Sequence, residues 1–149
     1  MTNFETILKE RGVLAYTNRG VSMMPLLRQG KDILVVRTHS GSYQKDDAVL
    51  FKRANGQYIL HRITKVNGDG SYIIIGDNCP DNSAERIREE QILGILTEVQ
   101  RNGKTIRVTD RKYLFYVKTV PLRRKLVKPK RFCRRALSKV YHLFFKKKG

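Results

Sequence analysis

Asn-Gly pairs recur between short apolar runs along the middle of the chain, and this pattern constrains the fold more than any other feature. They stand at Asn55-Gly56, Asn67-Gly68 and Asn102-Gly103. Asn and Gly both accept the positive φ that a two-residue type I′ turn requires, so the first and third pairs predict tight β-hairpins. The apolar runs read DILVV, AVLF, QYILHRITKV, SYIIIGD, QILGILTEVQ and KTIRV. Successive β-branched runs without long helices predict a mainly β protein with an antiparallel, coiled or partly closed sheet.

Helices are expected only at the two ends of the chain. Thr2 and Glu5 form a capping-box pattern, and Gly12 suits the position after a helix, so one short N-terminal helix is predicted. From Arg131 to Lys148, apolar residues recur at steps of three and four opposite a Lys/Arg face, which predicts a basic amphipathic helix. The expected divisions are a short N-terminal helix (1–12), a β domain (13–110) and a basic amphipathic tail (111–149). We expect the β domain to carry the chemistry.

The positive charge of the chain is concentrated in that tail. Residues 111–149 hold 15 of the 31 Lys and Arg residues and no acid, so the net charge of residues 1–110 is +3, against +18 for the whole chain. Such a segment needs a polyanionic partner. Its aromatic residues follow one helical stripe and are not interleaved with the cations. This arrangement favours an anionic membrane surface, bound through residues 123–148, over nucleic acid.

Several classes of protein are disfavoured by what the chain contains. No apolar run reaches the roughly 18 residues that span a bilayer, and the N-terminus lacks the apolar stretch of a signal peptide. Cys79 and Cys133 lie far apart, so reduced thiols are expected, and the three scattered histidines add no ligand spacing. The sequence therefore predicts no metal and no cofactor. We expect a cytoplasmic protein that is peripheral to the inner face of the membrane.

Three residues carry the chemistry that the sequence suggests. Ser22 stands at a sharp corner, in GVSMMP, just before an expected strand. His61 lies in the expected strand YILHRI and shares a face with its apolar neighbours two positions away, while Asp77 follows another strand in GDN. Each alone is typical of a structural role, as a turn serine, a core histidine or a turn aspartate. Together they are the residue types of a serine hydrolase, in which imidazole takes the serine proton and a carboxylate orients the ring.

The order of these motifs resembles that of the signal-peptidase and LexA-like serine endopeptidases. Within them it is most similar to the branch that uses histidine as the base, the endoplasmic-reticulum and sporulation-type signal peptidases. The matching positions are Ser22-Met23 with Pro25, Gly30 with Asp32, Tyr58 with His61-Arg62, and Gly76-Asp77-Asn78 with Asp81. The resemblance covers residues 13–100. It implies a coiled antiparallel β domain and a serine endopeptidase that cuts a peptide or an exported protein after a small residue.

The resemblance also assigns a role to each residue. Ser22 is the nucleophile, and its backbone N–H serves the oxyanion. His61 is the general base, and Asp77 is the orienting carboxylate, with Asp81 as the alternative. Met23 and Met24 line the pocket for the small substrate side chain.

Two other functions stay open. A self-cleaving LexA-like regulator would use a lysine as its base, and Lys65 lies on the same expected strand as His61. A non-catalytic β module would instead use its basic tail to bind nucleic acid or an anionic membrane.

Overall fold

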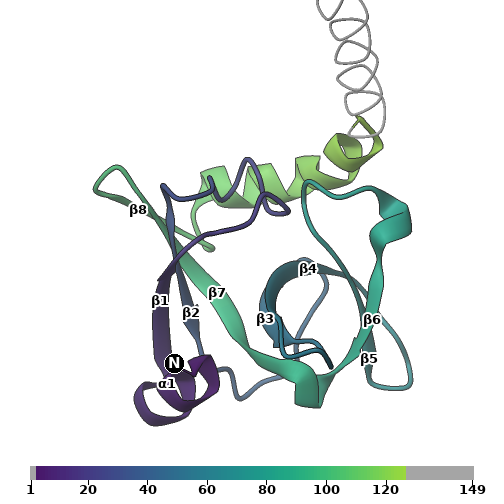
Figure 1. Ribbon diagram of the computed structural model, residues 1–149. Helices are drawn as coiled ribbons and strands as arrows, with labels where there is room; N and C mark the ends of the chain where they lie inside the picture. The colour runs from purple at the N-terminus through teal and green to yellow at the C-terminus, as the bar shows by residue number, and fades with distance from the viewer. Residues whose placement is uncertain (1–2, 127–149) are drawn as a thin grey trace, which may run out of the picture.

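The computed structural model describes residues 3–126 and contains one antiparallel sheet with a helix near each end of the described chain (Figure 1). Its elements are α1 (Phe4–Arg11), β1 (Val13–Thr17), β2 (Ile33–Arg37), β3 (Ala48–Lys52), β4 (Tyr58–Val66), β5 (Ser71–Ile75), η1 (Asp81–Ser83), β6 (Glu85–Arg88), η2 (Glu89–Gln91), β7 (Ile92–Arg101), β8 (Lys104–Arg107) and a C-terminal helix over residues 111–126. The prediction of a mainly β, antiparallel fold is confirmed. The amphipathic helix predicted over residues 131–148 lies outside the described residues.

The strand order is β1-β2-β7-β3-β4-β5-β6, with β8 paired to β7, and every pair is antiparallel. The longest strand, β7, joins the two halves of the sheet, because its first residues pair with β3 and its later residues pair with β2 and β8. The two ends of the order, β1 and β6, do not pair with each other. The sheet therefore coils without closing into a barrel.

The Asn-Gly pairs lie at turns, but only one forms the tight turn that was predicted. Asn102 and Gly103 have φ of 50° and 74° between β7 and β8, as a type I′ turn requires. Asn55 and Gly56 lie in a five-residue connection between β3 and β4, where only Gly56 has a positive φ. At the N-terminus, the side chain of Asn3 accepts a hydrogen bond from the backbone N–H of Glu5 and caps α1.

The core consists of two clusters of buried side chains, to which the two faces of the strands contribute. On β3, Leu50 belongs to the first cluster, and Val49 and Phe51 belong to the second, as the alternation of a strand requires. The first cluster also contains Leu8 from α1 and Tyr113 from the C-terminal helix. Both helices therefore contribute side chains to the same core cluster.

The described part of the expected tail is an integral part of the β domain. Tyr113, Val117 and Val120 of the C-terminal helix are 6%, 8% and 1% exposed, and the helix lies across one end of the sheet (Figure 1). The helix continues through Pro121 as far as residue 126. The expected division after residue 110 thus separates a helix from the sheet on which it packs.

We predict that Val120→Ala lowers the free energy of unfolding by about 2 kcal/mol, because it removes buried methyl groups and leaves a cavity. Phe115→Ala, on the same helix but 72% exposed, should change it by less than about 0.5 kcal/mol. Urea denaturation of the two variants provides the comparison. Equal, small effects would contradict the packing of this helix on the sheet.

Candidate active site

Ser22 lies in the loop between β1 and β2, and Asn18 holds this loop in shape from within. The side-chain amide of Asn18 donates hydrogen bonds to the carbonyl oxygens of Gly20 at 2.7 Å and Leu27 at 3.3 Å. Its backbone carbonyl accepts a hydrogen bond from the N–H of Gly30 at 2.7 Å. One buried asparagine therefore ties the beginning of the loop to its end.

A buried carboxylate fixes the same loop to β7. Asp32 is fully buried, and its side chain accepts hydrogen bonds from Arg28 at 2.7 Å and from Arg101 at 2.6 Å. Arg101 also donates to the carbonyl oxygen of Leu26 at 2.7 Å. Burial alone would raise the pKa of Asp32, but the hydrogen bonds from the two guanidinium groups outweigh it and hold that pKa well below its ordinary value.

Ser22 packs against the loop that follows β5. The backbone N–H of Asn78 donates to the carbonyl oxygen of Ser22 at 2.7 Å, and the Asn78 side chain donates to that of Val21 at 3.0 Å. A Cβ at Gly76 would lie 2.8 Å from the Ser22 carbonyl oxygen and 3.0 Å from the Ser22 Cβ. Only glycine therefore permits this approach of the two loops.

The register of β4 and β5 places His61 on the strand beside Gly76. Arg62 pairs with Ile75, so the next residues along the two strands, His61 and Gly76, come opposite one another. Residues opposite each other in an antiparallel pair present their side chains on the same face of the sheet. His61 therefore lies on the strand beside Gly76, the residue against which Ser22 packs, although Ser22 and His61 are 39 positions apart in the sequence.

His61 is buried in a setting that keeps its ring neutral. Its ring centroid lies 6.1 Å from that of Phe51, and its Nδ1 lies 3.5 Å from Oε1 of Glu85 on β6 and makes no hydrogen bond with any described residue. Arg53 binds the Glu85 carboxylate through two hydrogen bonds of 2.5 and 2.7 Å. Burial lowers the pKa of His61 to about 4; Glu85 opposes this shift, and Arg53 adds to it. At pH 7 the ring can therefore accept a proton.

Asp77 is engaged by partners other than His61. Its fully buried carboxylate accepts hydrogen bonds from Arg62 at 2.8 and 2.7 Å and from the hydroxyl of Tyr116 at 2.9 Å. Arg62, itself 1% exposed, also donates to the hydroxyl of Tyr113 at 3.1 Å. Burial raises the pKa of Tyr116, and the charge of Asp77 raises it further. Both carboxylate oxygens of Asp77 therefore accept hydrogen bonds from Arg62 or Tyr116. No hydrogen bond between Asp77 and His61 supports the orienting role that was predicted for Asp77.

The carboxylate beside His61 belongs to a residue that the sequence analysis did not select. Glu85 is the first residue of the strand β6, which lies in the segment after β5. The alternative, Asp81, is exposed, and its Oδ1 lies 3.5 Å from Nε of Arg124 on the C-terminal helix. In the sequence, Glu85 could have been identified as an acid at the start of the short segment ERIR, which follows a strand and a polar turn.

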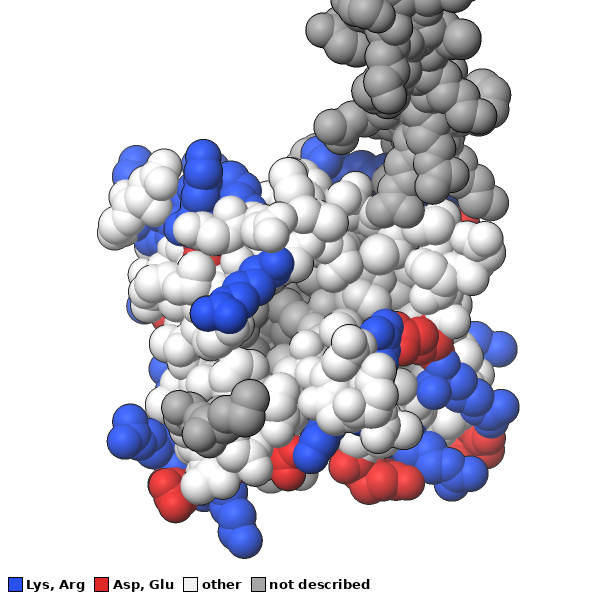
Figure 2. All heavy atoms as spheres, in the orientation of Figure 1, with Lys and Arg blue, Asp and Glu red and all other residues white. Residues whose placement is uncertain are grey.

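A cavity of about 270 Å³ opens beside Ser22. It is lined by Phe4, Leu14, Tyr16, Asn18, Arg19, Gly20, Ser22, Met23, Leu34, Leu50, Tyr58, Ile59 and Leu60. Phe4 of α1 packs on Tyr16 and Tyr58, with ring centroids 4.8 and 4.9 Å apart. Figure 2 shows this face hollowed in the middle, with most charged side chains around the rim. Of the two methionines predicted to line a pocket, Met23 lines this one, whereas Met24 is 36% exposed and does not.

Within residues 3–126, no group of three or more His, Cys, Asp or Glu side chains is placed to hold a metal ion. No helix in the same range has both the length and the apolar character needed to cross a membrane. A scan of the chain against protein-family models finds no match, and a comparison with curated proteins finds none either.

We predict that the two acids beside the site differ in their effect on stability. Asp77→Asn should lower the free energy of unfolding by about 3 kcal/mol or more, because it leaves the guanidinium of Arg62 buried without a counter-charge. Glu85→Gln should lower it by about 1 kcal/mol or less, because this carboxylate and Arg53 are both partly exposed. Urea denaturation measures both, and equal losses would contradict these assignments.

Proposed function

We propose that the protein is a serine endopeptidase in which Ser22 is the nucleophile and His61 is the general base. The observation that carries the proposal is that Ser22, which lines an apolar cavity, packs against Gly76, while the buried, neutral His61 lies on the strand beside Gly76. The resemblance to the histidine-using signal peptidases supports the same pair of residues.

In the proposed reaction, the hydroxyl oxygen of Ser22 attacks the carbonyl carbon of the scissile peptide bond while His61 takes the hydroxyl proton. The backbone N–H of Ser22 stabilises the oxyanion that forms. His61 then gives its proton to the leaving amine, and the peptide C–N bond breaks to leave an acyl-enzyme. A water molecule hydrolyses this ester with His61 again acting as the base.

We assign the orienting role to Glu85 in place of Asp77 or Asp81. Its Oε1 lies 3.5 Å from Nδ1 of His61, so a small movement of either side chain completes a hydrogen bond. A carboxylate at this position fixes the ring tautomer and stabilises the imidazolium that forms during the reaction. Arg53 holds Glu85 in place. In this assignment Asp77 serves the site indirectly, by fixing the loop against which Ser22 packs.

The proposed substrate is an extended peptide that runs along β1. This strand is the first in the sheet order, and within residues 3–126 only one of its edges pairs with another strand, so the other edge offers a place for a peptide to pair. Leu14 and Tyr16 of β1 line the cavity, and β1 leads directly into the Ser22 loop. A substrate side chain next to the scissile bond would enter the cavity, whose apolar lining suits an uncharged residue; the resemblance implies a small one.

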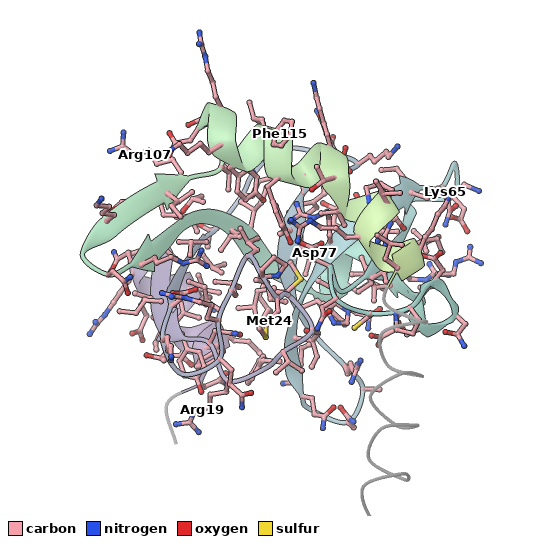
Figure 3. The ribbon with its side chains drawn as sticks, turned by 90° about the horizontal axis from the view of Figure 1, so that it is seen from above. Arg19, Met24, Lys65, Asp77, Arg107 and Phe115 are labelled. Carbon is pink, nitrogen blue, oxygen red and sulfur yellow. The ribbon has the colours of Figure 1, made fainter. Side chains whose placement is uncertain are left out.

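A lysine-based, LexA-like mechanism is less well supported. Lys65 is exposed near the end of β4 that turns into β5, four positions along the strand from His61. Figure 3 places it at the edge of the molecule, well apart from Asp77 and Met24. Cys79 is the alternative nucleophile to Ser22, because its Sγ also lies next to Gly76, 2.8 Å from where a Cβ would stand.

We predict that Ser22→Ala and His61→Ala each reduce peptide cleavage by about a thousandfold or more, while Cys79→Ser stays close to the parent. Mass spectrometry of a mixed peptide library incubated with each full-length variant measures the cleavage, and circular dichroism checks the fold. Cleavage by Ser22→Ala at the parent rate would refute the proposal. A parent chain that cleaves nothing would favour the non-catalytic module.

The pH dependence tests the assignment of the base. The value of kcat/KM should rise with pH through an apparent pKa of about 4, because only the neutral ring of His61 accepts the serine proton. Glu85→Gln removes a charge that raises this pKa, so the rise should move to lower pH. Arg53→Gln removes a charge that lowers it, so the rise should move to higher pH. A rise that neither variant moves would belong to another group.

A further inference from the structure

The C-terminal helix has a second apolar face that points away from the sheet. Four of its large apolar residues are exposed: Leu114 at 50%, Phe115 at 72%, Leu122 at 64% and Leu126 at 50%. Figure 3 shows Phe115 on the outer side of this helix, turned away from Asp77. Folded soluble proteins seldom leave such a concentration of large apolar side chains on one short element.

Cations lie among these apolar residues on the same face. Residues 111, 115, 118 and 122 follow the spacing that aligns side chains along one side of a helix. Arg111, Lys118 and Lys125 are exposed there. The whole segment 111–126 contains six Lys and Arg residues and no Asp or Glu. The face therefore combines apolar side chains with positive charge that no acid of the same helix offsets.

We propose that this outer face docks in the headgroup region of an anionic lipid bilayer. The apolar side chains would enter the boundary between headgroups and acyl chains, and the Lys and Arg side chains would extend to the lipid phosphates. Each cation near such a surface adds to the attraction. The contact differs from the one expected over residues 123–148, because it lies on a helix that is packed into the β domain.

The charge and shape of this face favour a bilayer over other partners. A second copy of the chain would bring together two molecules of net charge +18. Nucleic acid binding without sequence preference uses several aromatic platforms, and this face offers only Phe115. A bilayer needs only a stripe of apolar residues and cations along one side of a helix. Residues 127–149, which follow directly in the sequence, add nine cations and no acid.

The inner face of the same helix would determine where the Ser22 loop lies relative to the bilayer. Tyr116 holds Asp77, and Tyr113 contacts Arg62, so the helix is tied to the loop that seats Ser22. Pro25 and Leu26 of the Ser22 loop border a cavity together with these two tyrosines. Docking of the helix would thus hold the Ser22 loop close to the bilayer surface.

The chain contains no tryptophan, so a single introduced one reports on this contact. Phe115→Trp and the control Val66→Trp, at a position on β4 that is 44% exposed, are made in the full chain. With vesicles of phosphatidylcholine and phosphatidylglycerol, the indole emission of the Phe115→Trp variant should shift to shorter wavelength and be quenched by brominated acyl chains. The emission of the Val66→Trp control should not change. Unshifted emission from a Phe115→Trp protein that sediments with the vesicles would overturn the proposal, because another segment would then make the contact.

Sedimentation of a double variant gives a second readout. Phe115→Ser with Leu122→Ser should weaken vesicle binding by about tenfold or more, whereas Val66→Ser should not. All of these side chains are exposed, so circular dichroism should show an unchanged fold. Equal binding by the double variant and the parent would refute the docking of this face. An emission shift of the Phe115→Trp variant with single-stranded RNA but not with vesicles would also refute it and assign the face to nucleic acid.

Discussion

The ion pair between Arg62 and Asp77 is the interaction on which the rest of the site depends. Both side chains are almost completely buried, and either one without the other would leave an uncompensated charge in the interior. The chain must therefore bring the loop after β5 onto β4, and the hydroxyl of Tyr116 ties the C-terminal helix to the same carboxylate. Because Asp77 is fixed, its neighbours are fixed too, and they seat Ser22. Because Arg62 is fixed, His61 beside it is fixed on the opposite face of the strand.

Asp77 and Glu85, the two acids near His61, have different electrostatic roles. Asp77 neutralises a buried cation and is saturated by its partners, whereas Glu85 is partly exposed and faces the histidine ring. A histidine with a pKa of about 4 is neutral at pH 7 but is a weak base, so in the proposed mechanism the imidazolium needs support at the moment it forms. Glu85 can provide that support more effectively once a substrate covers the site and excludes water, because the attraction between opposite charges then grows.

The sequence predicted the fold better than it predicted the partners within the site. Strands and hairpins are local properties, so β-branched runs and the pair Asn102-Gly103 identify them directly. The helix over residues 111–126 was missed as a packing element because its buried stripe is set among many cations and a proline. Glu85 was missed because β6 is only four residues long and its place depends on pairing with β5. Asp77 lies in the loop against which Ser22 packs, but its partners, Arg62 and Tyr116, depend on the register of β4 and β5 and on the packing of the C-terminal helix.

The proposed function rests on a reactive Ser22 with His61 beside it, and the structure of the full chain bound to a peptide boronate tests this most directly. The account predicts a tetrahedral boron bonded to the hydroxyl oxygen of Ser22, with Nε2 of His61 at about 3 Å from a boronate oxygen or from the Ser22 oxygen. It also predicts that the side chain next to the boron occupies the cavity beside Met23. Boron bonded to Cys79, or an unmodified Ser22 with the ring of His61 turned away from it, would contradict the account.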